Sequence, residues 1–147
     1  MGRAGGRGIV VAVDSTARTI LIATDADEVL DEVDAALADE ATRVVRVRAG
    51  RDVLGAVREV APDLVVLDLQ IGNMGGVATA LGLRNEESAG RLDPTTILML
   101  LDRTADVFIS QQARADGWLV KPLDSLRLRR AAEALLAGGT YTDGLAS

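Results

Sequence analysis

The sequence of 147 residues contains no cysteine and no histidine. Without cysteine, the chain has no disulfide, no zinc–thiolate site and no cysteine nucleophile. Without histidine, it lacks the commonest metal ligand and general base, and a Ser-His-Asp triad is excluded. These two absences remove most classes of metal and nucleophile chemistry.

Long apolar runs and an excess of positive charge are absent as well. No run approaches the roughly 20 residues needed to span a bilayer, and no signal-peptide pattern opens the chain. The 16 basic and 22 acidic residues give a net charge of −6, which argues against a dedicated nucleic-acid binder. We therefore expect a soluble, cytoplasmic protein that binds neither nucleic acid nor a membrane.

From residue 19 onward, short apolar runs alternate with amphipathic helical patterns. Apolar runs without polar alternation are typical of parallel strands buried on both faces, and they lie at 19–24, 43–47, 64–67, 96–101 and 118–120. Helical patterns separate them, including one over 52–61 that ends before Pro62 and one capped by Thr104 that runs to Ala115. Short connections between parallel strands require right-handed crossovers. The pattern predicts an α/β fold, a doubly wound (βα)5 sandwich of flavodoxin-like topology with strand order 2-1-3-4-5.

Three segments fall outside this alternation. Residues 1–18 are a Gly/Arg-rich N-terminal extension, either disordered or an extra edge segment, and 138–147 are a short polar tail. The segment 84–96 is expected to be a polar surface loop. The core domain is therefore predicted at 19–137. Because nothing remains for a second domain, we expect it to stand alone.

Polar residues follow several of the predicted strands. Asp25 follows the first, Asp68 the third and Lys121 the fifth. Ligands of open parallel sheets bind beyond the carboxyl ends of the strands, so these side chains are expected to meet. Two carboxylates facing a lysine suit Mg²⁺ together with an anion. Asp68 would attack a phosphoryl group as the nucleophile, and Lys121 would pair with its oxygens.

Residues 19–137 resemble a response-regulator receiver domain, the phosphoacceptor domain of two-component signalling. The resemblance is carried by Asp25, by "LVVLD" ending at Asp68, by "NMGG" (73–76) and by "GWLVKPL" (117–123). It implies that Asp68 is the phosphoacceptor, that Lys121 is the family's lysine, and that the Lys121–Pro122 peptide bond is cis.

The same resemblance implies a cofactor and partners. Mg²⁺ would be held by Asp25, Asp68 and the backbone carbonyl of Gln70. The phosphoryl group would come from a sensor histidine kinase or a small phosphodonor. The output would be an effector protein or a homodimer, docked on the face of strands four and five and their helices that contains Trp118 and Arg127.

Several positions depart from the family pattern. Thr24 replaces the first of two acids, Leu101 replaces a Ser or Thr, and Gly72 replaces a Pro. Leu101 cannot donate a hydrogen bond, and such a bond to a charged group is worth roughly 1.5–3 kcal/mol, comparable to an allosteric coupling of about 1–3 kcal/mol. Trp118 replaces the switch aromatic and is expected either to face outward or to fill the core. We therefore expect an atypical receiver with weak Mg²⁺ binding.

Other interpretations remain open. Thr24 and Leu101 favour a pseudo-receiver adaptor that binds its partner regardless of phosphorylation. A flavodoxin-like FMN carrier would need a Ser/Thr/Gly-rich loop where "TDADEV" is acidic, and an aspartate-nucleophile phosphatase would need a cap domain. We therefore expect a signalling module that is not an enzyme. Asp27 is expected to cap the first helix, and Asp102 and Arg103 are expected to lie in a solvated loop.

Overall fold

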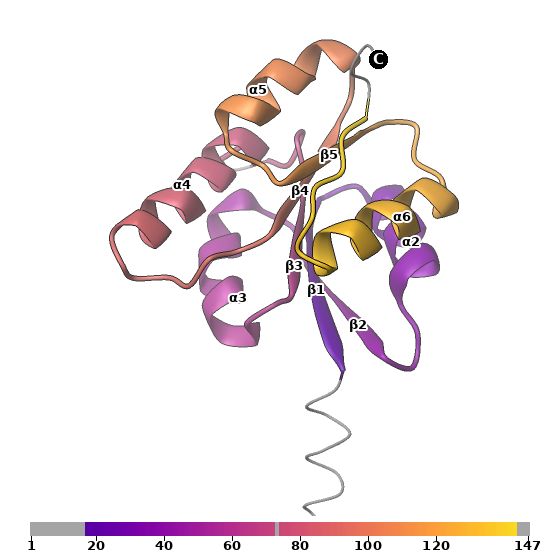
Figure 1. The fold of residues 1–147 in the computed structure, drawn as a ribbon, viewed down its shortest axis with the longest axis horizontal. Coiled ribbons are helices and arrows are strands. Elements are labelled where there is room, and N and C mark those ends of the chain that lie inside the picture. The colour runs from indigo at the N-terminus through magenta and orange to yellow at the C-terminus, as the bar shows by residue number, and fades with distance from the viewer. Residues whose placement is uncertain (1–16, 73, 144–147) are drawn as a thin grey trace, which may run out of the picture.

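The structure is a computed structural model that describes residues 17–72 and 74–143. Its centre is a five-stranded sheet with the order β2-β1-β3-β4-β5 (Figure 1). All neighbouring strands pair in parallel. The strands are β1 (Arg18–Ala23), β2 (Thr42–Val47), β3 (Leu64–Asp68), β4 (Ile97–Leu101) and β5 (Gly117–Val120). The predicted fold class and strand order are confirmed.

Helices cover both faces of this sheet. They are α2 (Asp27–Leu37), α3 (Val53–Val60), α4 (Gly76–Ser88), α5 (Val107–Gln112) and α6 (Ser125–Leu136), with 3-10 turns η1 (Gly50–Asp52) and η2 (Thr104–Asp106). Helices α2 and α6 pack on one face and α3, α4 and α5 on the other (Figure 1). This arrangement is the three-layer sandwich that the alternating pattern predicts.

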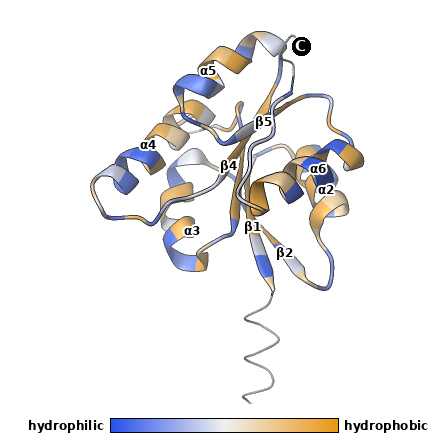
Figure 2. Cartoon of the chain, in the orientation of Figure 1, coloured by the Kyte–Doolittle hydropathy of each residue, from blue (hydrophilic) through white to orange (hydrophobic). Residues whose placement is uncertain are grey.

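The strands supply side chains to both layers of the core. In β3, Val66 packs toward α2 and α6, whereas Val65 and Leu67 pack toward α3 and α4. Successive side chains of a strand point to opposite faces, and both faces are covered here, so neither face needs polar residues. Figure 2 shows the apolar colour concentrated in these central strands.

Helix α4 extends into the segment that the sequence predicts as a loop. The expectation for 84–96 is wrong at its start, because α4 continues to Ser88. Within this extension Arg84 is buried, and it is held by polar partners on the segments that lead into β4 and β5. It donates to the carbonyls of Thr95 and Arg114 and pairs with Asp116 at 2.9 Å. A polar residue therefore fills a position that the apolar pattern could not identify as helical.

Two other boundaries follow from local capping. Thr104 opens the 3-10 turn η2, whose N-cap is Arg103, so the prediction of Thr104 as the cap of an α-helix to Ala115 is wrong. Helix α3 ends at Val60, and Ala61 takes a left-handed conformation (φ 46°) directly before Pro62. The Lys121–Pro122 peptide bond is cis.

The ends of the chain are described only in part. Of the predicted extension 1–18, residues 1–16 lie outside the described residues, and Arg18 already begins β1. Of the predicted tail, residues 144–147 lie outside the described residues, and Tyr141 forms a parallel bridge with Gly117 of β5. Within the described part, no helix has the length and apolar character to cross a membrane.

Candidate functional site

Asp68, the last residue of β3, is the centre of the candidate site. Its side chain is 2 % exposed and both of its oxygens accept hydrogen bonds. Lys121 Nζ donates to Oδ1 at 2.8 Å, and the backbone N–H of Gln70 donates to the same oxygen at 3.1 Å. Thr24 Oγ1 donates to Oδ2 at 2.7 Å. The carboxylate is therefore surrounded by groups that stabilise negative charge.

Thr24 directly follows β1 and is fully buried. Its hydroxyl oxygen accepts a bond from the N–H of Ala26 at 3.1 Å while its proton goes to Asp68. Its carbonyl accepts from Arg46 Nε at 2.7 Å. The sequence identifies Thr24 as the substitute for an acid, but only the structure shows that this hydroxyl donates directly to Asp68.

Lys121 follows β5 and lies between two carboxylates. Besides Asp68, it pairs with Asp102 Oδ1 at 3.1 Å. Burial alone would lower the pKa of Lys121, but the bonds and charges of Asp68 and Asp102 outweigh it and raise the pKa above its usual value. The lysine is thus a fixed cation at the carboxyl edge of the sheet.

Asp102 was expected in a solvated loop, and the structure instead makes it part of the site. One of its oxygens bonds Lys121, and the other, Oδ2, is buried and has no partner among the described residues. The only signal for Asp102 in the sequence was its position directly after the strand at β4. An anion that approaches Lys121 would meet an ammonium group that already pairs with Asp102.

Asp25 and the loop after β3 lie at the same edge. Asp25 is exposed, and a methyl group at Gly72 would lie 3.4 Å from its Oδ2, so the carboxylate rests against this loop. A methyl group at Gly76 would lie only 2.8 Å from the carbonyl oxygen of Asp68, which explains the second glycine of "NMGG". Asn73 of that motif lies outside the described residues.

Asp27 does not cap α2 as expected. The N-cap residue is Ala26, and the Asp27 carboxylate accepts from Arg46 at 3.0 Å and from Arg48 at 3.4 Å. The hydrogen bond from Arg46 and the charge of Arg48 lower the pKa of Asp27. The expected stabilisation of the helix N-terminus by an acid still applies, but the arginines of the β2 region hold this side chain.

Whether these residues suit Mg²⁺ depends on the oxygen atoms that they offer as ligands. Within residues 17–72 and 74–143, no cluster of three or more acidic side chains could hold a metal ion. Asp25, Asp68 and the carbonyl of Gln70 nevertheless offer oxygen donors from one edge. Mg²⁺ typically uses one or two carboxylates and completes its shell with waters and phosphate oxygens. The oxygen donors present therefore fit the ligand chemistry of Mg²⁺.

The two predicted switch residues are both buried. Leu101 is fully buried in the layer of α3, α4 and α5, where it offers no donor to the site. Trp118 is 5 % exposed and belongs to the same layer. Its indole Nε1 donates to the carbonyl of Asp143 at 2.9 Å. Trp118 therefore does not face outward in this structure and its side chain fills the core, whereas its predicted role as a switch stays a prediction.

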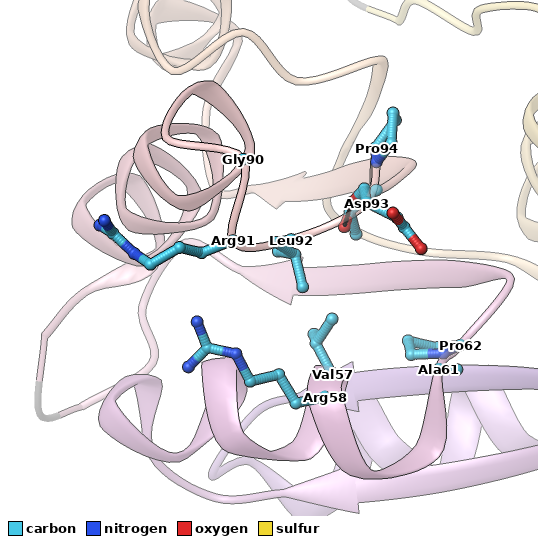
Figure 3. Close-up of a pocket in the computed structure, with 10 residues that line it drawn as sticks. Val57, Arg58, Ala61, Pro62, Gly90, Arg91, Leu92, Asp93 and Pro94 are labelled. Atoms are coloured by element: carbon cyan, nitrogen blue, oxygen red, sulfur yellow. Dashed lines mark hydrogen bonds between the residues drawn. The ribbon is translucent and has the colours of Figure 1, made fainter.

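A groove of about 460 Å³ lies where the chain leads into β3 and β4, at the ends of the strands opposite to Asp68. It is lined by the end of α3 and by the segment that leads into β4, including Val57, Arg58, Arg91 and Pro94 (Figure 3). Arg58 and Arg91 both pair with Glu86, at 2.5 Å and 2.8 Å. None of the predicted site residues lines this groove, so it is separate from the site around Asp68.

A family model and several curated proteins are similar to this chain in sequence. The family model of the response regulator receiver domain matches residues 20–133. The transcriptional regulatory protein AfsQ1 of Streptomyces coelicolor is 28% identical over 123 residues, which cover 82% of this chain and 52% of AfsQ1. The DNA-binding response regulator MtrA of Mycobacterium tuberculosis is 29% identical over 110 residues, covering 75% and 46%. The chain thus spans about half the length of these curated relatives.

Solved structures agree on the fold. The signal receiver domain of a signal transduction histidine kinase from Syntrophus aciditrophicus superposes with a TM-score of 0.73 at 24% identity, covering 89% of this chain and 98% of that one. The chemotaxis response regulator CheY4 of Vibrio cholerae gives a TM-score of 0.70 at 24% identity, covering 80% and 98%. At this identity the likeness shows the shared fold.

Proposed function

Because this chain belongs to the family of response regulator receiver domains, we propose that it accepts a phosphoryl group on Asp68 and signals by docking to a partner protein. The observation that carries this proposal is the 2.8 Å pair between Lys121 and Asp68 at the carboxyl edge of the sheet. This pair places a nucleophilic oxygen beside a cation that suits an incoming phosphoryl group.

The transfer needs only a rearrangement of the bonds around Asp68. One carboxylate oxygen attacks phosphorus, the bond from phosphorus to the donor's leaving group breaks, and the leaving group keeps the electron pair. An acyl phosphate results. Lys121 exchanges its bond to the attacking carboxylate for bonds to phosphoryl oxygens, as expected for charge stabilisation in phosphoryl transfer.

Mg²⁺ is part of this proposal. Asp25, Asp68 and the backbone carbonyl of Gln70 would hold it, and when bound it offsets the negative charge of the phosphoryl group. Thr24 supplies a hydroxyl where a second carboxylate would add to the affinity, and this hydroxyl is already committed to Asp68. We therefore propose weak Mg²⁺ binding.

The proposed partners follow from the surface of β4, α5, β5 and α6. Phe108 is 66% exposed and Leu126 is 57% exposed, and Ile109 lies beside Phe108 on α5. Exposed apolar side chains on α5 and α6, which pack on opposite faces of the sheet, favour contact with another protein, either an effector or a second copy of the chain. The net charge of −6 favours a protein over DNA for this segment.

We propose a sensor histidine kinase or a small phosphodonor as the source of the phosphoryl group. The role is that of a cytoplasmic switch and not of an enzyme with its own turnover.

The test is phosphorylation of the isolated chain. The protein is incubated with Mg²⁺ and acetyl phosphate, or with beryllofluoride, and followed by intact mass and by the fluorescence of Trp118. We expect one adduct and a fluorescence change, and neither in Asp68→Ala. No adduct at millimolar donor, or an adduct that persists in Asp68→Ala, contradicts the proposal.

A second function is favoured by the bonds that already hold Asp68 and Lys121. Thr24 occupies one oxygen of Asp68, Asp102 shares Lys121, and Leu101 has no donor for a phosphoryl oxygen. These features fit a pseudo-receiver adaptor, which binds its partner equally well with or without a phosphodonor. Partner affinity measured with and without beryllofluoride separates the two functions.

A further inference from the structure

Residues 141–143, here called the C-terminal strap, lie along the outer edge of β5. The backbone N–H of Trp118 donates to the carbonyl of Tyr141 at 2.9 Å, and Gly117 and Tyr141 form a parallel bridge. The indole of Trp118 donates to the carbonyl of Asp143. Figure 1 shows this last yellow segment returning from α6 past β5. The strap therefore occupies the edge of the sheet as an added strand would.

Asp143 anchors the strap through its side chain. Its Oδ2 accepts from the N–H of Val120 at 3.0 Å and from the Arg127 guanidinium. Arg127 also donates to the carbonyls of Val120 at 2.9 Å and Pro122 at 2.8 Å. The carboxylate thus binds a cation that is itself fixed to the end of β5, next to Lys121.

Gly117 shows that the sequence of β5 accommodates the strap. A methyl group on Gly117 would lie 2.6 Å from the carbonyl oxygen and 3.2 Å from the nitrogen of Tyr141. Glycine weakens a strand and often marks a close approach of another backbone. Gly138, with φ 89°, ends α6 and allows the chain to turn back toward β5. Glycines therefore allow both the close approach of Tyr141 to β5 and the turn that precedes it.

In every hydrogen bond that the structure describes between the strap and this edge, the edge supplies the donor. The donors are the N–H groups of Trp118 and Val120, the indole N–H and the Arg127 guanidinium. Free strand edges bind extended segments through the main chain, and side-chain contacts supply the selectivity. An edge with three donors and a cation selects a segment that offers carbonyls and a carboxylate.

We propose that the β5 edge is a strand-addition site for an extended, acidic segment of a partner protein, and that the strap competes for it within the chain. The favoured segment carries an acid two residues after the residue whose carbonyl accepts from Trp118, as Tyr141 and Asp143 do. This inference deepens the proposed docking function and rests on it for its biological meaning. Its test uses no phosphodonor, so the site and the phosphorylation of Asp68 can fail separately.

The first experiment displaces the strap in the full chain. Gly117→Ala is expected to shift the emission of Trp118, the sole tryptophan, to longer wavelength, to raise its acrylamide quenching several-fold and to speed hydrogen exchange at Val120. The matched control is Gly55→Ala in α3, where an added methyl group meets nothing within 4 Å. Unchanged emission and exchange in Gly117→Ala would show that the strap does not occupy this edge and would overturn the inference.

The second experiment fills the edge from outside. Asp143→Lys opens the strap by repulsion from Arg127 but leaves the β5 edge intact, and circular dichroism checks that the variant is folded. A peptide with the sequence of residues 138–147 is titrated to millimolar concentration against this variant and the native chain. We expect saturable binding to the variant and at least fivefold weaker binding to the native chain, because the tethered strap has the advantage of high effective concentration.

Two controls make the binding specific. A peptide with Asp143→Asn should bind at least fivefold more weakly, and adding Gly117→Ala to the Asp143→Lys chain should remove binding, because the methyl group blocks the peptide as it blocks the strap. Binding that ignores the peptide's charge and the Gly117 substitution overturns the inference. So does a folded Asp143→Lys chain with an exposed Trp118 that binds no peptide.

Discussion

The hydroxyl of Thr24 donates a 2.7 Å hydrogen bond to Asp68 Oδ2, and both side chains are buried. The bond joins the ends of β1 and β3, which are neighbours in the sheet. Where the family pattern has an acid, this chain has a neutral donor. The hydroxyl of Thr24 therefore helps to stabilise the candidate phosphoacceptor as an anion.

Replacing Thr24 by valine keeps the shape of the side chain and removes the donor. The buried carboxylate of Asp68 loses one of its bonds, so we expect Thr24→Val to lower the free energy of unfolding by about 1.5–3 kcal/mol, the usual range for a bond to a charged group. Urea unfolding measures the change. Thr104→Val, at an exposed position, should stay near the native value. A stable Thr24→Val would show that the bond contributes little.

Restoring the family residues should restore phosphorylation. Thr24→Asp adds a carboxylate beside Asp25, and Leu101→Thr adds a donor at the end of β4. We expect the double variant to bind Mg²⁺ more tightly and to form the acyl phosphate faster than the native chain, as followed by Trp118 fluorescence and intact mass. Without Mg²⁺, Thr24→Asp should be less stable, because two like charges then face each other. Failure of the double variant to increase labelling would mean that these two positions do not limit phosphorylation.

Asp102 is expected to slow phosphorylation by holding Lys121. The 3.1 Å pair competes with phosphoryl oxygens for the ammonium group, and the second carboxylate repels an incoming anion. Asp102→Asn should therefore raise the rate of adduct formation several-fold, measured by intact mass over time with acetyl phosphate. The matched control is Asp93→Asn, which changes an exposed acid in the segment that leads into β4. A slower Asp102→Asn would instead assign Asp102 a supporting role at the site.

Glu86 makes the stability depend on acid pH. Hydrogen bonds from Arg91 and then Arg58 outweigh burial and lower the pKa of Glu86 from 4.5 to about 2 (Figure 3 shows both arginines). Because the folded-state pKa lies below the unfolded one, this stabilisation is fully present above pH 4.5 and is lost as the pH falls toward 2.

The variant that tests this dependence is Glu86→Gln. The difference in urea midpoint between the native chain and Glu86→Gln should be constant above pH 4.5 and should shrink toward pH 2. Glu133→Gln, an exposed acid on α6, should show no such trend. A difference that does not change with pH would exclude the charge of Glu86 as its source.

The fold was predictable because its central strands, β3 and β4, are buried on both faces. A short, continuous apolar run such as 64–67 does not have the pattern of an amphipathic element and is typical of a strand covered on both faces. The short connections between such strands leave few possible sheet topologies. The approach of Asp68 to Lys121 was predictable for a related reason, since the carboxyl ends of parallel strands share one edge. The sequence separation of 53 residues is therefore bridged by topology alone.

The polar contacts were not predictable in the same way. The pairing of Asp102 with Lys121, the burial of Arg84 and the strap at β5 all depend on where a single polar group finds its partner. Hydrophobic periodicity carries no information about such partners. The sequence offered only a weak signal for the strap, the residues "TYTD" after two glycines.

Lys121 is the sole lysine of the chain, and the remaining basic residues are arginines. Any acylation of a lysine side chain within these 147 residues therefore falls on the one ammonium group that bridges Asp68 and Asp102. Such a modification would remove the positive charge, leave two carboxylates facing each other without a counterion, and silence the site. Amine-reactive reagents, followed by peptide mapping to separate Lys121 from the N-terminal amino group, thus probe whether this bridge is closed.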